Sequence, residues 1–486
     1  MSEQKDELKL VRSWTAYPPT YRAREMDMLA GWIAAGESGS VVGLPGSGRS
    51  NLLGFLCHQP EVVCAYLPIR AGSLALIPVD INNLPANNLS TLYRVIIRSF
   101  YWVRDQFSEP LQQKISDIYQ ETRFERDPFV TQSSLQELLF LCRDHHVRVV
   151  LVLNRFDSFC QMATPHMVNT LRGLRDDFKD TLSYIAGMTQ EVAYLPDPTV
   201  LGEMYELLDN YVCWVGAMNE EDTRNLIARA THPAPTAPTD TDINTMLRLT
   251  GGFPSLLRAT CHWWLITKNK PDHPDWAGML LGERSIQHRL AQIWHGLTQE
   301  EQFTLSELQK LQTTAARGKT GRNSETKPKN FDKKYRDFVQ EHQGILVRLK
   351  AKGTCTQTET HWWIADLLAA YVTKVEGRGR GRIWLDEKTG EIYQGPTLLS
   401  DLTALEKSVL SFLIKHPRLS HTKTDLIINT WPDELRQQGV ADSSLYQVIL
   451  TLRKAIEPNP SEPSYLITWR GKPEGGYQFF PEGRPR

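Results

Sequence analysis

Gly43-Leu-Pro-Gly-Ser-Gly-Arg-Ser50 is the stretch that decides the fold of this 486-residue chain. It fits the phosphate-binding loop pattern G-x-x-x-x-G-K-[ST] at every fixed position except one, because Arg49 stands where the pattern has lysine. The stretch follows an apolar run at residues 40–42 and opens into residues 50–56, which have the apolar spacing of a helix. In such a strand–loop–helix unit, backbone N–H groups and the helix N-terminus point at phosphate oxygens, so the sequence predicts a site for a nucleoside triphosphate.

The loop supplies most of the predicted nucleotide contacts. Its glycines let the backbone curl around phosphate, and Ser50 is also the predicted Mg²⁺ ligand. Arg49 is a cation, but its planar fork can hold phosphate without supporting the same transfer chemistry as lysine. We therefore expect ATP or ADP as the ligand, with Mg²⁺ as an optional companion. The loop residues assigned to binding are Gly43, Gly46, Ser47, Gly48, Arg49, Ser50 and Asn51.

Composition narrows the class of protein. The length predicts about three domains, and a formal net charge of −1 gives no global basic signature for nucleic acid. Seven cysteines occur without C-x-x-C spacing, which argues against a zinc finger and against a disulfide framework. The chain has no apolar signal-peptide core at its start and no apolar window of about 18 residues. We expect a cytoplasmic protein with no membrane partner.

From residue 40 to about 230, short apolar runs alternate with longer helical stretches, which is the pattern of a parallel sheet flanked by helices. Helical periodicity fills residues 89–103 and 135–142, and residues 219–231 begin with a capping asparagine and first-turn acids. The fold class of this part is therefore α/β. The predicted strands are residues 40–43, 74–81, 147–154, 182–188 and 211–215.

A second strand end bears on the chemistry. P-loop enzymes use a carboxylate there to hold Mg²⁺. The run at residues 147–153 instead ends at Asn154, and Asp157 follows three residues later. We assign Asn154 and Asp157 as the candidate catalytic positions, where Asp157 either leans into the site or caps the next helix. Thr189-Gln190 follows another strand and is either a γ-phosphate sensor or a polar loop. The changes at positions 49 and 154 favour holding nucleotide over turnover and leave ATPase activity open.

Four elements in order resemble the STAND class of AAA+-related signalling ATPases over about residues 20–275. They are Tyr21-Arg22-Ala23-Arg24-Glu25, the P-loop, the strand at 147–157 and Gly251-Gly252-Phe253-Pro254. The resemblance implies that Arg24 and Glu25 lie near the nucleotide base and that Pro254, in a helical lid, lies near the nucleotide. It also implies that ATP acts as a switch controlling oligomerisation, which would make this chain a nucleotide-dependent homo-oligomer.

The C-terminal part reads as three helices, at about 403–415, 422–431 and 442–457, followed by two strand-like runs at 465–469 and 476–480. Three helices and a terminal hairpin describe a winged helix. Residues 383–482, with the hairpin at 383–393 that precedes the helices, are similar to the OmpR/PhoB-type winged helix of bacterial transcription regulators. That resemblance implies a third helix in the major groove of DNA and a wing beside it.

The third helix separates into two faces on a helical wheel. Leu445, Val448, Ile449, Leu452 and Ile456 form an apolar face that would pack on the other helices. The opposite face carries Leu450 and polar residues able to meet base edges or phosphates. The residues assigned to DNA binding, from this helix and the wing, are Gln447, Thr451, Arg453, Lys454, Arg470 and Lys472.

The domain organisation follows from these elements. Residues 1–24 form an N-terminal segment, 25–275 the nucleotide-binding domain with its lid, and 286–375 a winged-helix-like helical unit with a flexible insertion at 313–330. The Gly/Arg stretch at 376–382 is a linker or a phosphate-gripping arm, and 383–486 is the winged helix. Two tryptophan pairs, Trp263-Trp264 and Trp362-Trp363, are expected in helices as packing residues.

These features predict a nucleotide-binding switch that controls DNA binding and transcription through the C-terminal winged helix, with weak or absent hydrolysis. Two alternatives remain. One is a scaffold with a relic P-loop, whose winged helices bind a protein partner instead of DNA. The other is an active ATP hydrolase of a defence or signalling system.

Overall fold

The computed structural model describes residues 17–67, 74–81, 84–234, 236–320, 331–358, 361–375, 381–387, 389–395, 397–432, 442–472 and 474–484. The chain divides into two compact units, one of residues 1–296 with 350–354 and one of residues 297–349 with 355–486. Within the described residues, no helix is both long and apolar enough to cross a membrane.

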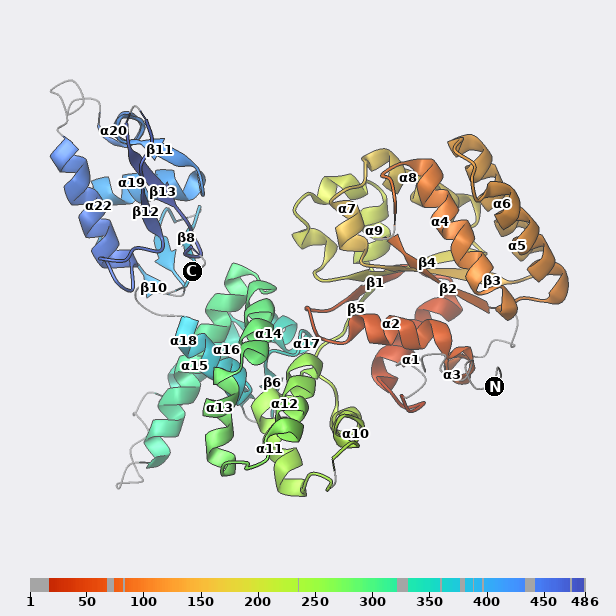
Figure 1. Cartoon of the computed structure of the whole chain (residues 1–486), viewed down its shortest axis with the longest axis horizontal. Coiled ribbons are helices and arrows are strands. Elements are labelled where there is room, and N and C mark those ends of the chain that lie inside the picture. The colour runs from red at the N-terminus through yellow and green to blue at the C-terminus, as the bar shows by residue number, and fades with distance from the viewer. Residues whose placement is uncertain are drawn as a thin grey trace, which may run out of the picture. The chain divides into compact units, whose positions relative to one another are not determined.

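The first unit is built on a five-stranded sheet in the order β2-β3-β4-β1-β5, with every neighbouring pair parallel (Figure 1). Each strand lies within a residue or two of its predicted bounds, so the α/β prediction is confirmed. Parallel strands that are covered on both faces have near-continuous apolar sequences, so the strands could be predicted from the apolar runs alone. The strands are β1 (Gly39–Val42), β2 (Leu74–Asp80), β3 (Arg148–Asn154), β4 (Leu182–Met188) and β5 (Val212–Trp214).

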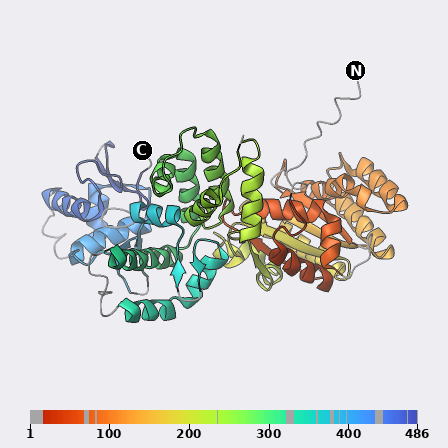
Figure 2. The same ribbon diagram turned by 90° about the horizontal axis from the view of Figure 1, so that it is seen from below.

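Helices cover both faces of this sheet. Three of them, α1 (Ala23–Ala35), α2 (Arg49–His58) and α3 (Pro60–Tyr66), pack on one face and lie in front of the sheet when it is seen from below (Figure 2). The other face carries the larger core. Its helices are α4 (Leu89–Trp102), α5 (Glu109–Thr122), α6 (Pro128–Asp144), α7 (Phe156–Cys160), α8 (Pro165–Asp177) and α9 (Met204–Asp209).

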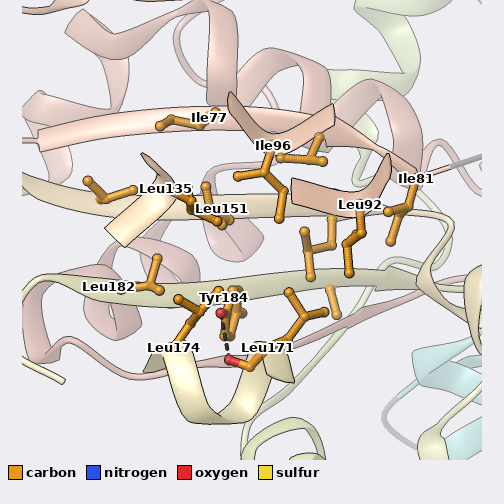
Figure 3. Packing of buried hydrophobic residues seen from close by; sticks show 14 of the residues in the cluster. Ile77, Ile81, Leu92, Ile96, Leu135, Leu151, Leu171, Leu174, Leu182 and Tyr184 are labelled. Atoms are coloured by element: carbon orange, nitrogen blue, oxygen red, sulfur yellow. Dashed lines mark hydrogen bonds between the residues drawn. The ribbon is translucent and has the colours of Figure 1, made fainter. Parts of the chain in front are cut away.

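The larger core consists of alternate residues of β2, β3 and β4 packed against the helices that cover this face. Ile77 and Leu151 lie in one buried cluster with Leu92, Ile96 and Leu135 from the helices that cover this face (Figure 3). The buried hydroxyl of Tyr184 donates a 2.8 Å hydrogen bond to the carbonyl oxygen of Leu171, which satisfies the one polar atom of that ring (Figure 3). Burial of this set on one face positions the carboxyl ends of the strands in a single row.

Five further helices complete the first unit after β5. Asn219 caps the first of them by accepting from the N–H of Asp222 at 2.7 Å, as predicted. Gly251 ends the second with a φ of 61°, a left-handed conformation that favours glycine. The helices are α10 (Glu220–Thr231), α11 (Asp240–Thr250), α12 (Pro254–Ile266), α13 (Trp276–Gly282) and α14 (Arg284–His295). Short 3₁₀ turns occur at η3 (Arg104–Gln106), η4 (Val192–Tyr194), η5 (Pro198–Leu201) and η6 (His273–Asp275).

The second unit begins with helices and a two-stranded antiparallel sheet. Its elements are α15 (Gln299–Thr320), α16 (Phe331–Glu341), α17 (Gln343–Ala351), β6 (Thr356–Gln357), β7 (Trp362–Trp363) and α18 (Asp366–Val375). Two expectations were wrong here. Residues 313–320 continue α15 instead of opening an insertion, since Ala315 and Ala316 favour helix. Trp362 and Trp363 lie in β7, where aromatic residues are favoured. The rest of the expected insertion, 321–330, lies outside the described residues.

The C-terminal part of the second unit carries the predicted winged helix. A three-stranded sheet in the order β10-β9-β8 comes first, and the sheet β11-β13-β12 ends it. The elements are β8 (Ile383–Leu385), β9 (Ile392–Gln394), β10 (Thr397–Leu398), α19 (Ala404–Lys415), β11 (Ser420–Thr422), α20 (Lys423–Thr430), α22 (Asp442–Ile456), β12 (Leu466–Trp469) and β13 (Gly476–Phe479). All of the apolar face predicted for α22 is buried. The expected linker at 376–382 falls mostly outside the described residues.

Candidate functional site

The phosphate-binding loop joins β1 to α2 as the sequence predicts. Gly46 and Gly48 have φ angles of 85° and 92°, which residues with a Cβ rarely adopt. A Cβ on Gly43 would stand 2.4 Å from the Ser47 hydroxyl oxygen, so this position also requires glycine. The loop therefore takes its shape from the three glycines themselves.

A pocket of about 440 Å³ opens over this loop. Three of its lining residues are arginines, Arg49 from α2, Arg258 from α12 and Arg289 from α14, and none of the described residues that line it carries a carboxylate. The full lining is Gly43, Leu44, Pro45, Gly46, Gly48, Arg49, Ser50, Asn51, Thr189, Pro254, Ser255, Arg258 and Arg289. The side chains available to a ligand are thus cationic or neutral.

Arg49 is the most unusual group in the pocket. Its side chain is 9% exposed, and its Nε and Nη1 atoms have no hydrogen-bond partner among the described residues. Burial lowers the pKa of Arg49, and the charge of Arg155 adds to this, whereas Asp157 opposes it. A buried guanidinium with unpaired donors is costly unless it meets an anion. Its planar fork matches the oxygens of a phosphate group.

Other buried polar atoms around the loop are also unpaired within the part of the chain that the structure describes. The hydroxyl oxygens of Ser47 and Ser255 are among them, as is the Oδ1 atom of Asn154. Such atoms are rare in folded proteins, and a group of them suits a site that completes its hydrogen bonds with a ligand.

The strand end beside the loop differs from one expectation. Asn154 ends β3 as predicted, but Asp157 does not cap the helix that follows. Instead its Oδ2 atom accepts from the backbone N–H of Thr189 at 2.9 Å and from the Thr189 hydroxyl. Asp157 thus reaches across to the end of β4, since parallel strands end at the same edge. Arg155, which lies between Asn154 and Asp157 in the sequence, takes a left-handed conformation with a φ of 58°.

The side chains of Thr189 and Gln190 have different surroundings in the structure. Thr189 lines the pocket, whereas Gln190 donates from Nε2 to the carbonyl oxygen of Tyr194 at 2.6 Å and does not. The candidate phosphate sensor is therefore Thr189, held by Asp157.

The two arginines of the 21–25 element differ in environment, and neither lines the pocket. Arg24 is exposed on α1 and is absent from the pocket lining. Arg22, which the sequence reasoning missed, is 1% exposed, and its guanidinium donates to the carbonyl oxygens of Ser47 at 3.0 Å and Gly216 at 2.8 Å. Glu25 forms an ion pair with Arg22 at 3.1 Å and does not line the pocket, and its place near a nucleotide base stays a prediction. No local pattern distinguishes positions 22 and 24, because the partners of Arg22 lie far along the chain.

The lid contacts the loop directly. The N–H of Ser255, in the first turn of α12, donates to the carbonyl oxygen of Gly46 at 3.1 Å, and the preceding Pro254 lines the pocket. Contact of Pro254 with a nucleotide stays a prediction. Arg258 and Arg289 were missed because nothing in their helical spacing marks them as facing the loop.

A second pocket, of about 370 Å³, is lined by Tyr17, Leu226, Arg229, Ala230, Arg258, His262 and Leu265. Arg229 lies over the ring of Tyr17 with its Cζ atom 4.1 Å from the ring centroid. Arg258 lines both pockets, so the two adjoin at this residue.

The donor set does not fit the Mg²⁺ expected at Ser50. Mg²⁺ in phosphate-transfer sites takes carboxylate and hydroxyl oxygens together with phosphate. Here the hydroxyls of Ser50, Thr189 and Ser255 line the pocket without a carboxylate. Across the described residues, no group of three or more His, Cys, Asp or Glu side chains is arranged to hold a metal ion.

The third helix of the winged helix, α22, presents the predicted polar face. Gln447, Thr451 and Lys454 are exposed, as are Arg470 and Lys472 in the wing. Tyr446, at 57% exposed, was missed as a candidate contact. Arg453 has a different role from the one predicted: its guanidinium donates to the carbonyl oxygen of Leu466 at 2.9 and 2.8 Å and to the Thr468 hydroxyl at 3.0 Å. It ties α22 to β12.

Several solved structures are similar to most of the chain. The ORC2 protein of Aeropyrum pernix in its ADPNP–ADP complexes has 13% identity and a TM-score of 0.36, covering 73% of this chain and 92% of that chain. A Walker-type ATPase of Pyrococcus abyssi has 13% identity and a TM-score of 0.41, covering 74% and 98%. The ORC1 protein of Aeropyrum pernix in complex with DNA has 13% identity and a TM-score of 0.34, covering 75% and 95%.

At 13% identity and TM-scores below 0.5, these structures do not indicate a function for this chain. The argument for function therefore rests on the chain's own residues. A comparison with curated proteins finds no match. Residues 399–479 match the family model described as "Transcriptional regulatory protein, C terminal", and this part of the chain is accordingly similar to the DNA-binding winged helix of transcription regulators.

Proposed function

We propose that this protein is a nucleotide-responsive transcription regulator, in which ATP or ADP bound over the phosphate loop controls DNA binding by the C-terminal winged helix. The observation that carries the proposal is the buried guanidinium of Arg49, at the start of α2, in a pocket lined by two further arginines. Its Nε and Nη1 atoms have no hydrogen-bond partner among the described residues. The same chain ends in a domain of the transcription-regulator type.

Binding follows from the chemistry of the pocket. A polyphosphate would pair with Arg49, Arg258 and Arg289 and accept from the backbone N–H groups of the loop. The adjoining second pocket, with Tyr17 and Arg229 stacked at one side, offers the remainder of the ligand a place to extend. The two pockets together suit a nucleotide better than a phosphate ion alone.

Weak or absent hydrolysis follows from the strand end. Asn154 replaces the carboxylate of an efficient site, and Asp157 is engaged by the N–H and hydroxyl of Thr189. A general base needs a free carboxylate within reach of the attacking water. Asn154 has no carboxylate. The Oδ1 atom of Asp157 is without a partner among the described residues, but it is buried and outside the pocket lining. We therefore expect the bound nucleotide to act as a ligand more than as a substrate.

The switch rests on contacts that join the loop to neighbouring segments. Ser255 ties the lid to Gly46, and Arg22 ties the loop carbonyl of Ser47 to Gly216. Residues 350–354 belong to the first unit and pack near the segment that contains Gly216. The Nζ atom of the buried Lys352 lies 5.3 Å from the ring centroid of Trp214 in β5. Because residue 354 continues directly into the second unit, nucleotide-dependent movement of the loop has a covalent route to the DNA-binding part.

The test is a calorimetric titration of the full chain with ATP and with ADP, followed by DNA binding with and without saturating nucleotide. We expect a measurable Kd for nucleotide, slow or absent phosphate release, and a DNA affinity that differs between the two states. Failure to bind any ATP or ADP analogue at millimolar concentration would rule the proposal out. Size-exclusion chromatography with light scattering on the same samples tests the nucleotide-dependent homo-oligomer.

A second candidate, an interaction scaffold, is favoured by one observation. Since β12 engages Arg453, Lys454 is the basic side chain left exposed on the described face of α22, which also exposes the ring of Tyr446. This face is less basic than DNA binding usually requires. Absence of DNA binding at low salt, together with a stable protein partner, would decide for the scaffold.

A further inference from the structure

Arginine side chains supply the positive charge around the phosphate loop. Arg49, Arg258 and Arg289 come from three different helices and line the same space over the phosphate loop. Arg155 adds a fourth positive charge close enough to lower the pKa of Arg49. Each guanidinium can bind a phosphate with two parallel hydrogen bonds, and its charge does not depend on a bound metal.

Two carboxylates near the phosphate loop, those of Asp157 and Asp80, do not line the pocket. The Oδ2 atom of Asp157 accepts from Thr189, and its Oδ1 atom is buried without a partner among the described residues. Its charge opposes the lowering of the Arg49 pKa. Asp80, at the end of β2, lies in register with Asn154 on the neighbouring strand. Neither Asp80 nor Asp157 belongs to the pocket lining. A Mg²⁺ ion beside the phosphates would have to share this space with guanidinium groups, which repel it.

Charge also favours one form of the ligand. Metal-free ATP carries more negative charge than its magnesium complex, and a pocket of arginines without carboxylates attracts the more negative form more strongly. In a site with acidic residues the preference is reversed, because the metal then bridges two sets of negative groups.

We infer that this pocket binds the metal-free form of a nucleoside polyphosphate, with arginine side chains supplying the positive charge that Mg²⁺ supplies in other phosphate-loop sites. The inference rests on the proposed nucleotide binding and adds that this binding is independent of divalent cations. Nucleotide binding then depends on guanidinium–phosphate pairs and on the N–H groups of the loop, and not on a divalent cation.

The experiment measures the Kd for ATP by isothermal titration calorimetry of the full chain, once with excess EDTA and once with excess MgCl₂. We expect the Kd in EDTA to be equal to or smaller than the Kd in MgCl₂. A Kd about tenfold larger in EDTA overturns the inference but leaves nucleotide binding intact. Absence of binding in both buffers overturns the proposed function and this inference together.

Two variants sharpen the result. Arg289→Ala should weaken ATP binding in EDTA about tenfold, since it removes one charged contact, whereas the exposed Arg143→Ala on α6 should not. Asn154→Asp places a carboxylate at the strand end and should make the affinity dependent on Mg²⁺. If Arg289→Ala binds ATP in EDTA as tightly as wild type, or if Asn154→Asp stays insensitive to the metal, arginines do not replace the ion. Thermal unfolding of each variant shows that the fold is retained.

Discussion

The guanidinium of Arg22 donates a hydrogen bond of 3.0 Å to the carbonyl oxygen of Ser47, inside the phosphate-binding loop. The same group reaches the carbonyl oxygens of Gly216 and Ala217 and forms an ion pair with Glu25. Arg22 therefore positions the loop from a segment that precedes it by some 25 residues. It would act on nucleotide binding through the loop without touching the phosphates.

Arg22→Ala should lower the free energy of unfolding by about 3 kcal/mol or more, because it leaves buried carbonyl groups without donors. Scanning calorimetry of the full chain measures this. The matched control is Arg24→Ala, an exposed position two residues away that should change stability by less than about 0.5 kcal/mol. Equal effects of the two substitutions would contradict the assigned role.

Arg49→Ala should weaken nucleotide binding about tenfold to a hundredfold, since hydrogen bonds to charged groups contribute about 1.5–3 kcal/mol each. The nucleotide-free protein should be as stable as wild type or more stable, because an unpaired buried guanidinium is removed. Titration calorimetry and thermal unfolding test the two effects separately. A variant that loses stability and keeps its affinity would show that Arg49 is structural.

Gly46→Ala should lower stability by about 1–3 kcal/mol and weaken nucleotide binding, because the left-handed conformation strains any residue with a Cβ. The new Cβ would also stand 2.3 Å from the Ser255 hydroxyl and push the lid from the loop. Gly173→Ala is the control: it lies inside α8 with nothing within 4 Å of the new Cβ. There we expect a gain of about 0.5–1 kcal/mol. Denaturant unfolding compares the two.

Arg470→Ala and Lys472→Ala should each weaken DNA binding and reduce the salt dependence of log K by about one unit of slope, as expected for phosphate contacts. Arg453→Ala should instead lower the melting temperature of the winged helix, since its guanidinium holds Leu466 and Thr468. Fluorescence anisotropy over a salt series, with thermal unfolding alongside, separates the two classes. Loss of DNA affinity in Arg453→Ala at unchanged stability would reverse the assignment.

Asp222 should make stability depend on pH. Burial raises its pKa above the usual 3.8, although the backbone N–H and the charge of Arg22 act in the other direction. The folded state thus holds this proton more tightly, and the stabilisation is present below pH 3.8 and lost as the pH rises through the raised pKa. Unfolding free energies of wild type and Asp222→Asn across this range should show wild type losing stability relative to the variant. A relative gain with rising pH would contradict the assignment.

The sheet and the C-terminal domain were predictable because their signals are local. Buried parallel strands read as apolar runs, so β4 was predicted with its observed bounds, Leu182–Met188. The apolar face of α22 followed from helical spacing and is buried throughout. Local signals also failed in places. Trp362 and Trp363 were expected in a helix but pair with Gln357 and Thr356 in a two-stranded sheet.

The sequence by itself determined the phosphate loop, the α/β sheet that carries it and the winged helix, because glycine conformations and apolar periodicity act over a few residues. Only the tertiary structure decided which charged groups belong to the site. Arg22 reaches Gly216 across 194 positions, Asp157 reaches Thr189 across 32, and Arg258 and Arg289 line the pocket from separate helices. Such partners meet through the packing of whole elements, and a side chain's burial and charge environment exist only after that packing.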